Sequence, residues 1–310
     1  MGNQPQVTVL GSLNMDISVS VPRLPEPGAT VLGSAARFTP GGKGANQAVA
    51  AARLGAAVRM AGCVGDDDFG RQLLAALRAE KINAGHVRTV PGVPTGLAMI
   101  SVDAAGENLI TVAPGANHEV GVGEVAAAAG SPGDVLVICA EIPVPAIKAA
   151  LAQGARCVLN LAPAPADPTE AAAIMAGGVD WLVVNETEAA AVLGRTVQGL
   201  KDAAQAASAL VAAGPRHAVV TAGAHGAALA GPDGTGTVSA FRVDAVDTVG
   251  AGDTFVGALA VALAAGIPAA EAVRAASAAA ATAATRPGAQ AGMPRPEDVL
   301  ATTGVSWPIG

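Results

Sequence analysis

The chain has 310 residues, of which 51% are apolar and 14% charged, and its formal net charge is −7. The high apolar fraction and low net charge exclude a disordered chain, and 39 glycines without a Gly-X-Y period exclude collagen. The acidic balance and the 2% aromatic content argue against a nucleic-acid partner, because such proteins need a basic face and stacking platforms. Alanine, with 75 residues, dominates the composition.

Cysteine use and segment hydropathy predict a cytoplasmic location. The three cysteines are widely spaced and form no C-x-x-C pair, which favours a reducing compartment over a disulfide framework or a zinc site. The opening segment MGNQPQVTVLGS lacks the pattern of a signal peptide. The most apolar stretch, residues 254–270, contains two glycines and a proline and is shorter than the roughly 18–20 residues that span a bilayer. We therefore expect no membrane partner.

The first third of the chain predicts alternating strands and helices and one hairpin. Residues 7–10 predict a buried strand that ends in a Gly-Ser turn, and residues 58–64 predict another strand. Residues 45–54 and 69–81 have the composition and periodicity of helices. Residues 95–103 and 108–112 flank a turn and predict a hairpin that belongs to a small separate sheet.

The remaining two thirds show a regular α/β pattern. Short apolar runs at residues 135–139, 157–161, 181–184 and 217–221 alternate with alanine-rich helical stretches, which predicts a parallel sheet covered on both faces. Residues 231–236 predict a turn-rich hairpin linker before residues 241–243, and residues 252–285 are predicted to be mostly helical. No linker or shift in composition divides the chain, so we expect one α/β domain over residues 1–310.

Two common nucleotide-binding motifs are absent. Gly41-Gly42-Lys43-Gly44 continues with Ala45, so it is not a Walker A loop. No G-x-G-x-x-G fingerprint occurs, which argues against an NAD-dependent oxidoreductase.

A glycine-rich turn at residues 247–255 (DTVGAGDTF) leads directly into a long apolar helix. The free amides of Gly250, Ala251 and Gly252 would lie at the positive end of the helix dipole, where anions bind. Asp253 follows in the first turn. A carboxylate there either caps the helix or removes a proton from a hydroxyl that attacks a bound phosphoryl group.

Two further groups of polar residues lie near the N-terminus, one at the start of a predicted helix and one after the first predicted strand. Residues 41–47 (GGKGANQ) place Lys43 and Asn46 among glycines that permit close approach of a ligand, or else form an ordinary helix entry. Asn14 and Asp16 follow the first predicted strand, where ligands of open α/β sheets bind. They could hold vicinal hydroxyls or form an Asx turn.

The fourth group is Asn185-Glu186-Thr187-Glu188, at the end of the predicted strand 181–184. Its acidic oxygens suit Mg²⁺ held through water and phosphates. The same spacing, with Asn185 three residues before Glu188, is also that of a helix capping box.

Together and in this order, the four groups resemble the ribokinase (PfkB) family of carbohydrate kinases. The likeness extends from Val9 to about Gly292 and is most specific at residues 41–55 (GGKGANQAVAAARLG) and 247–255. PGAN at residues 114–117, LNLAPA at 159–164 and TRPGAQ at 285–290 add to it. The resemblance implies a three-layer α/β/α fold with a mostly parallel central sheet. It also implies a small β-sheet lid, built from segments at about residues 17–38 and 95–112, which covers the sugar and forms a homodimer contact.

The activity implied is ATP-dependent phosphorylation of ribose at its 5-hydroxyl, with Mg²⁺ and a monovalent cation, normally K⁺, as cofactors. Asp253 matches the catalytic base, and Gly250, Ala251 and Gly252 match the anion hole. The sugar-binding positions are Asn14, Asp16, Gly42, Lys43, Asn46, Glu141 and Asp253. The nucleotide positions are Asn185, Thr221, Ala222, Gly223, Ala224, His225, Gly226, Gly252 and Ser277, with Asn185 and Glu188 acting indirectly on Mg²⁺. The monovalent-cation positions are Asp247, Val249, Ala283, Arg286, Gly288 and Gly292.

Other functions remain open at this point. Within the same family, the substrate could be deoxyribose, fructose, 2-keto-3-deoxygluconate or a nucleoside, although the absence of Tyr and only four Phe disfavour a pocket for a base. A non-catalytic sugar or nucleotide sensor on the same fold would not need Asp253 beside its glycine turn.

Overall fold

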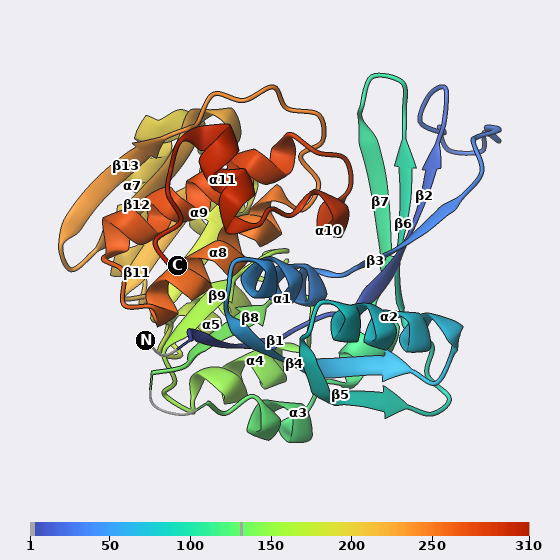
Figure 1. Ribbon diagram of the computed structural model, residues 1–310, viewed down its shortest axis with the longest axis horizontal. Coiled ribbons are helices and arrows are strands. Elements are labelled where there is room, and N and C mark those ends of the chain that lie inside the picture. Colours follow the sequence, from blue (N-terminus) through green and yellow to red (C-terminus); the bar gives the residue numbers. More distant parts are fainter. Residues whose placement is uncertain (1–3, 131–132, 310) are drawn as a thin grey trace.

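The computed structural model describes residues 4–130 and 133–309. Figure 1 shows a large central sheet with helices on both faces and a second sheet that projects to one side. The first three residues of the opening segment, for which the sequence predicts no signal peptide, lie outside the described residues.

The central sheet has nine strands in the order β13-β12-β11-β10-β9-β8-β1-β4-β5. Neighbours from β11 to β5 pair in parallel, and only β12 and β13 add antiparallel pairings at one edge. The strands are β1 (Gln6–Leu10), β4 (Ala57–Gly65), β5 (Asn83–Val90), β8 (Val135–Cys139), β9 (Cys157–Asn160), β10 (Trp181–Asn185), β11 (His217–Thr221), β12 (Gly226–Gly231) and β13 (Gly234–Ser239). Because β1 pairs with β4 on one side and β8 on the other, chain order reverses there, and ligands of open α/β sheets bind at such a reversal.

Helices cover both faces of this sheet, so the predicted three-layer α/β/α architecture is confirmed. One face carries α1 (Lys43–Arg53), α2 (Asp68–Ala79), α8 (Ala251–Ala264), α9 (Ala269–Ala284) and α11 (Pro296–Thr303). The other carries α3 (Val122–Ala127), α4 (Val144–Leu151), α5 (Pro168–Met175), α6 (Glu186–Leu193) and α7 (Gly199–Ala212). Short helical segments η1 (Gly115–Glu119), η2 (Gly223–His225) and α10 (Ala289–Gly292) complete the chain.

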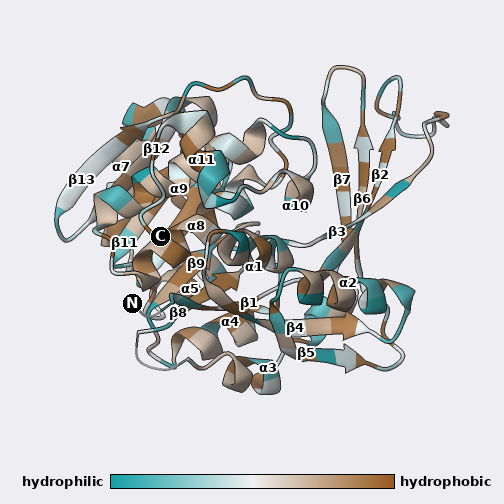
Figure 2. Ribbon diagram, viewed as in Figure 1, coloured by the Kyte–Doolittle hydropathy of each residue, from teal (hydrophilic) through white to brown (hydrophobic). Residues whose placement is uncertain are grey.

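Alternate residues of each central strand belong to opposite cores. In β10, Val183 packs into the core shared with α1, α8 and α9, whereas Leu182 and Val184 pack into the core on the other face. The period of two in a strand sends successive side chains to opposite faces, so a strand buried on both faces is apolar throughout. Figure 2 shows this hydrophobic centre in brown, with hydrophilic residues concentrated on the outer helix surfaces and loops.

The alanines are concentrated where helices pack against each other and the sheet. Ala258, Ala260 and Ala262 in α8 and Ala276 and Ala279 in α9 are fully buried. Small side chains let helix axes approach closely, and this explains how an alanine-rich chain with few aromatics still forms a dense interior.

The second sheet has four strands in the order β3-β2-β6-β7. They are β2 (Asn14–Ser20), β3 (Arg37–Gly41), β6 (Gly96–Val102) and β7 (Asn108–Ala113). The predicted hairpin is confirmed, because β6 and β7 pair antiparallel from Leu97 with Ala113 to Val102 with Asn108. β2 pairs in parallel with β6, and this pairing joins two segments far apart in the sequence.

Several predicted elements match and others need correction. The predicted strands at 135–139 and 217–221 have the observed bounds, and the predicted linker at 231–236 contains the β12–β13 turn. The sequence placed Asn14 and Asp16 at the end of the first strand, but they lie at the start of β2, in the second sheet. Strand β5 was not predicted, because half of its residues are exposed and polar. Among the helices of residues 4–130 and 133–309, none is long and apolar enough to cross a membrane.

Candidate active site

Polar residues from separate motifs meet at the carboxyl edge of the central sheet. Asn160, Asn185 and Thr221 end the neighbouring strands β9, β10 and β11, and Asp253 lies in the first turn of α8. A cavity of about 230 Å³ opens among them. It is lined by Lys43, Asn160, Ala162, Val183, Val184, Asn185, Glu188, Thr221, Thr248, Gly250, Gly252 and Asp253. The predicted glycine-rich turns and the predicted NETE segment therefore form one site.

The N-terminus of α8 has amides available for an anion. Gly250 caps the helix with φ 78°, a left-handed conformation, and a Cβ there would lie 2.9 Å from Cα of Ala289, so only glycine fits. The cap carries no side-chain hydrogen bond. The amide of Ala251 donates to the Thr248 carbonyl at 3.2 Å and that of Thr254 to the Gly250 carbonyl at 2.8 Å. The amides of Gly252 and Asp253 therefore remain for a ligand at the positive end of the dipole.

The N-terminus of α1 is built differently, although it also begins at a glycine with positive φ, Gly42. Its first amides are occupied: that of Lys43 donates to Oε2 of Glu141 at 3.3 Å and that of Gly44 to Oγ of Ser12 at 3.3 Å. The Ser12 hydroxyl in turn donates to the same Glu141 oxygen at 2.6 Å. This end of α1 therefore holds the Glu141 carboxylate in place.

Asp253 is a buried carboxylate, only 8% exposed, whose two oxygens each accept an amide hydrogen bond. Nδ2 of Asn46 donates to Oδ2 at 2.9 Å, and Nε2 of Gln47 donates to Oδ1 at 3.0 Å. Both donors lie in α1, which packs against α8. These two hydrogen bonds, one on each oxygen, fix the orientation of the carboxylate.

Lys43 lies among three carboxylates. Burial opposes its charge, but Asp253, Glu141 and Glu188 outweigh this effect and raise the pKa of the Lys43 ammonium above its usual value. It therefore stays protonated, with its charge directed toward a cavity lined by Glu188 and Asp253.

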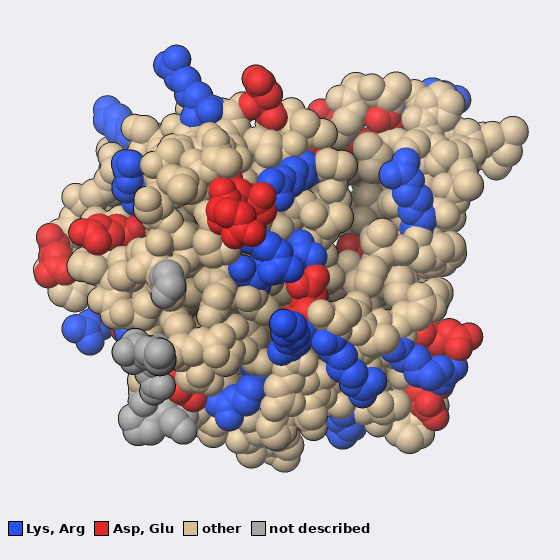
Figure 3. Space-filling view, in the orientation of Figure 1, with Lys and Arg blue, Asp and Glu red and all other residues tan. Residues whose placement is uncertain are grey.

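Asp16 adds a carboxylate from the second sheet. Burial raises its pKa to about 7, and the negative charges of Glu141 and Asp253 add to the shift while Lys43 opposes it. A Cβ on Gly41 would overlap the Asp16 carboxyl group, so the glycine leaves room for that group in its present position. Figure 3 shows a hollow between the second sheet and the central body, with an acidic side chain visible in its depth.

Asn14 is buried at the corner between β1 and β2, where Asn117 holds it. Nδ2 of Asn117 donates to Oδ1 of Asn14 at 2.7 Å and to the Leu13 carbonyl at 3.2 Å, and Oδ1 of Asn117 accepts from the Leu13 amide at 2.9 Å. Asn117 thus fixes the point at which the chain passes from one sheet to the other.

Asn185 and Glu188 form the capping box that the spacing also predicted. Oδ1 of Asn185 accepts from the Glu188 amide, and Oε2 of Glu188 accepts from the Asn185 amide, both at 2.8 Å. Burial raises the pKa of Glu188, which lines the cavity. The second carboxylate oxygen of Glu188, Oε1, is the kind of ligand that Mg²⁺ prefers. The described residues hold no cluster of three His, Cys, Asp or Glu side chains that would bind a metal alone.

The predicted monovalent-cation positions come together beside the Gly250 turn. Oδ1 of Asp247 accepts from the Val249 amide at 3.0 Å, and Oδ2 accepts from the Gly288 amide at 2.8 Å. A Cβ on Gly292 would lie 3.1 Å from the carbonyl oxygens of both Ala283 and Arg286, so these two acceptors flank one point. The Arg286 guanidinium does not take part, because it pairs with Asp298 at 2.7 Å.

Some of the predicted nucleotide-binding residues lie at the cavity and others lie away from it. Thr221 lines the cavity, and the chain from Ala222 to Gly226 turns closely at the end of β11, with the Ala222 amide donating to the Gly226 carbonyl at 2.7 Å. Gly223, Ala224 and His225 are exposed there. Ser277 is not among the residues that line the cavity, and its hydroxyl donates to the Val273 carbonyl within α9 at 2.8 Å.

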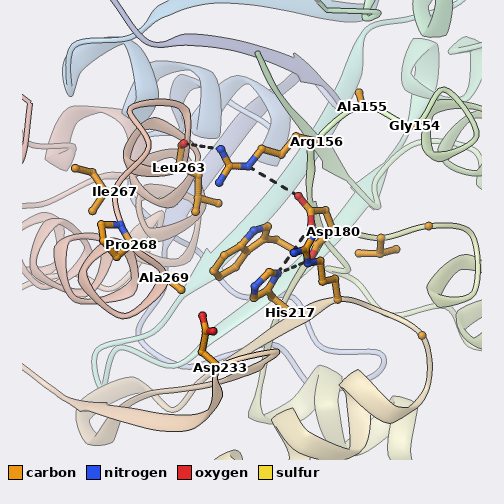
Figure 4. Close-up of a pocket in the computed structure, with 15 residues that line it drawn as sticks. Gly154, Ala155, Arg156, Asp180, His217, Asp233, Leu263, Ile267, Pro268 and Ala269 are labelled. Atoms are coloured by element: carbon orange, nitrogen blue, oxygen red, sulfur yellow. Dashed lines mark hydrogen bonds and ion pairs between the residues drawn. The ribbon is translucent and has the colours of Figure 1, made fainter. Parts of the chain in front are cut away.

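A larger cavity, of about 830 Å³, opens at the opposite edge of the sheet (Figure 4). Two of its polar side chains are bound to the wall: Nη1 of Arg156 donates to the Leu263 carbonyl at 2.8 Å, and His217 contacts the Asp180 carbonyl through Nδ1 at 3.2 Å. Burial lowers the pKa of His217, whose ring stacks on Trp181 with centroids 4.1 Å apart. The amino edge of a parallel sheet is not where such folds bind substrates, so the smaller cavity is the candidate active site.

Comparison with known proteins agrees with this geometry. A model described as pfkB family carbohydrate kinase matches residues 4–296. The chain belongs to this family. It is 37% identical to the ribokinase of Haemophilus influenzae, with 95% of this chain and 97% of that protein covered. The crystal structure of Thermotoga maritima ribokinase superposes with a TM-score of 0.85 at 34% identity, covering 96% of this chain and 98% of the other. The structure of Arabidopsis thaliana ribokinase complexed with ribose and ATP superposes with a TM-score of 0.83 at 30% identity, covering 96% of this chain and 98% of the other.

For several polar residues of the site in this pfkB family member, the sequence predicted no role. Gln47, Asn117 and Asn160 lie inside segments whose likeness to the family is visible in the sequence, but only the fold shows what they contact. Ser12 follows the first strand in a Gly-Ser turn, and its bond to Glu141 spans 129 positions of the chain. No local pattern indicates such a bond.

The raised pKa of Asp16 predicts a stability change with pH in this pfkB protein. Its value of about 7 in the folded chain exceeds the 3.8 of an unperturbed aspartate, so the folded state binds the extra proton and loses stability as pH rises from about 4 to about 7. Asp16→Asn should therefore raise the free energy of unfolding at pH 8 by roughly 1–3 kcal/mol, and the gain should vanish near pH 4.

Urea unfolding of the ligand-free protein at both pH values measures this effect. Asp233→Asn, a change at an exposed carboxylate, is the matched control and should leave stability unchanged. An Asp16→Asn protein no more stable than the wild type at pH 8 would contradict the assignment.

Proposed function

We propose that this chain transfers the γ-phosphoryl group of ATP to the 5-hydroxyl of D-ribose. The observation that carries the proposal is the buried Asp253 carboxylate beside open amides of the α8 N-terminus, in one cavity with Lys43, Asn185 and Thr221. Family membership and the likeness to ribokinases, one of them complexed with ribose and ATP, support this substrate pair.

Asp253 acts as the general base. Its carboxylate accepts the proton of the 5-hydroxyl as that oxygen bonds to the γ-phosphorus, and the bond from the γ-phosphorus to the β,γ-bridging oxygen breaks to release ADP. Such transfers depend on positioning and charge stabilisation more than on covalent catalysis. The amides of the Gly250–Ala251–Gly252 turn, chiefly that of Gly252, donate to the transferring oxygens from the helix terminus.

Cations supply the remaining positive charge. Lys43 contributes an ammonium on the cavity wall. Asn185 and Glu188 would hold Mg²⁺ through water, and the loop containing Asp247, with the carbonyls beside Gly292, would hold K⁺. Bound Mg²⁺ neutralises the phosphate oxygens. In this protein the capping box keeps the Glu188 side chain directed to the N-terminus of α6.

Hydrogen bonds hold the sugar. The proposed sugar ligands are Asn14 and Asp16 at the start of β2, Gly42, Lys43 and Asn46 at the start of α1, and Glu141 after β8. A furanose with adjacent hydroxyls offers both donors and acceptors to carboxylates, amides and an ammonium. The scarcity of aromatic residues, 2% of the chain, fits a polar ligand without a base.

The second sheet is proposed as the lid of a single ribokinase-like domain, in a cytoplasmic homodimer. Closing over the sugar would exclude water, which would otherwise accept the phosphoryl group. Exposed apolar side chains on the sheet, Phe38, Met99, Leu109, Ile110 and Val112, are 45–54% accessible and support a contact with a second copy.

The proposed base predicts the effect of Asp253→Asn. Turnover should fall by about 10²- to 10⁴-fold, because the hydroxyl proton then has no acceptor, while binding of ATP and ribose persists. Steady-state kinetics give kcat, and calorimetric titration gives both dissociation constants. Asp233→Asn serves as the control, and near wild-type turnover of the Asp253 variant would eliminate Asp253 as the base.

The proposed substrate predicts an order of specificity. In an ADP-release assay over pentoses, hexoses and nucleosides, ribose should give the highest kcat/KM, above deoxyribose, fructose and 2-keto-3-deoxygluconate. The missing 2-hydroxyl of deoxyribose leaves buried polar groups of the site without a partner, and such a loss is costly. A higher value for another acceptor would replace ribose as the substrate while leaving the kinase assignment intact.

The proposed cation site predicts activation by potassium. Replacing Na⁺ with K⁺ at constant ionic strength should raise kcat, and Asp247→Asn should reduce the difference because one carboxylate no longer joins the Val249 and Gly288 amides. Equal rates in the two salts for the wild-type protein would refute the site.

A further inference from the structure

Gln47 lies at the centre of a buried chain of hydrogen bonds that ends on Asp253. Its side chain is 0% exposed, and its Nε2 donates both to Oδ1 of Asp253 at 3.0 Å and to Oδ1 of Asn160 at 2.9 Å. Asn160 continues the chain, because its Nδ2 donates to the Val183 carbonyl at 3.2 Å. The chain thus connects α1, the ends of β9 and β10, and the first turn of α8.

The Val183 carbonyl, at the end of this chain of hydrogen bonds, determines which atom donates and which accepts in every bond. The Val183 carbonyl can only accept, so Asn160 must present its Nδ2 there and its Oδ1 to Gln47. Gln47 must then present Nε2 to Asn160, and the same nitrogen faces Asp253. Oδ1 of Asp253 is therefore held as an acceptor by a donor that has no alternative orientation.

The other oxygen of Asp253 is held in the same way from a neighbouring residue. Nδ2 of Asn46 donates to Oδ2 of Asp253 at 2.9 Å, and Oδ1 of Asn46 accepts from Nε2 of Gln290 at 3.1 Å. Two amides, one on each oxygen, prevent rotation of the carboxylate. They leave its remaining lone pairs for a proton.

Gln47 makes these bonds at a cost. Its Oε1 is buried and has no hydrogen-bond partner among the described residues, and an unsatisfied buried acceptor is destabilising. An apolar residue of similar length would avoid this cost in a buried helix position. A simple packing role therefore does not account for the amide, whereas a donor aimed at Asp253 does.

We propose that Gln47 is a positioning residue that holds Asp253 in the orientation required for proton transfer. It acts through Asp253 and does not touch the substrate. The inference rests on the proposed function, because it assumes that Asp253 is the base. Its effect should therefore appear in kcat and in the pH dependence of kcat, with little effect on substrate binding.

Gln47→Met tests the proposal because it keeps the side-chain length and removes both donated bonds. We expect kcat to fall by about 10- to 100-fold, as for loss of a group that orients a reacting residue, while KM for ribose and ATP changes by less than about 3-fold. Gln153→Met is the matched control. Gln153 is an exposed glutamine whose Nε2 donates to the Val125 carbonyl at 2.9 Å, far from the site, so its loss should leave kcat unchanged.

Gln47→Glu gives a readout that a purely structural role would not change. A second carboxylate beside Asp253 makes it harder for the pair to lose its last proton, so the acidic limb of kcat against pH should move to higher pH. Asp16, Lys43, Glu141 and Glu188 are the other charged groups that act on this site. All are retained in every variant, so only the shift relative to the wild type is interpreted.

The outcomes separate this inference from the proposed function. If Asp253→Asn loses turnover while Gln47→Met and Gln47→Glu keep wild-type kcat and pH profiles, the positioning role is wrong and the base stands. If Asp253→Asn stays active, the base assignment itself fails. Circular dichroism and urea unfolding check that each variant folds, and if Gln47→Met does not fold, the pH profile of the near-isosteric Gln47→Glu decides.

Discussion

The contact between α1 and α8 is the constraint on which the site depends. It places a carboxylate, Asp253, at the start of an apolar helix and surrounds it with amides from a second helix. Burial of a charge is unfavourable unless hydrogen bonds compensate for it, and here each oxygen has one such bond. The helix dipole of α8 adds a favourable interaction with the same group. Any change that separates the two helices removes this compensation and the proposed catalytic geometry together.

The charged residues around this contact lower the stability of the free protein and favour binding of a ligand. Asp16, Glu141, Glu188 and Asp253 surround the single ammonium of Lys43, and without a ligand the carboxylates repel each other. Burial raises the pKa of Asp16, and the negative charges of Glu141 and Asp253 add to the shift. A polar substrate that donates hydrogen bonds to these carboxylates, together with cations, would reduce this repulsion. Sites of this kind lower the stability of the free protein and increase the free energy gained on binding.

The sequence predicted the parts of the structure that depend on local patterns. Continuous apolar runs such as residues 135–139 and 217–221 identify strands buried on both faces, because both sets of alternate side chains are apolar. The glycine-rich turn before α1 was found because glycines permit close approach of a ligand, and the turn before α8 because a helix that follows it leaves amides free. Local patterns did not identify strand β2, because it depends on pairing with β6, more than 80 residues away along the chain; only the family resemblance indicated a lid segment, at about residues 17–38. Likewise, Gln47 reaches Asp253 across 206 positions, and no local pattern encodes such a bond.

The alanine content determines how closely the helices that carry the site can pack. In the core shared by α1, α8 and α9, alanines at positions such as 258, 260 and 276 let the helix backbones approach. At Gly257 the approach is closest, since a Cβ there would lie 2.6 Å from the Gln47 carbonyl oxygen. Gln47 can reach Asp253 because the two helices are this near to each other. A core filled with Leu and Phe would bury more apolar surface but would move α1 away from α8. The alanine-rich composition is, in this fold, the condition that lets short amide side chains from one helix hold a carboxylate on another.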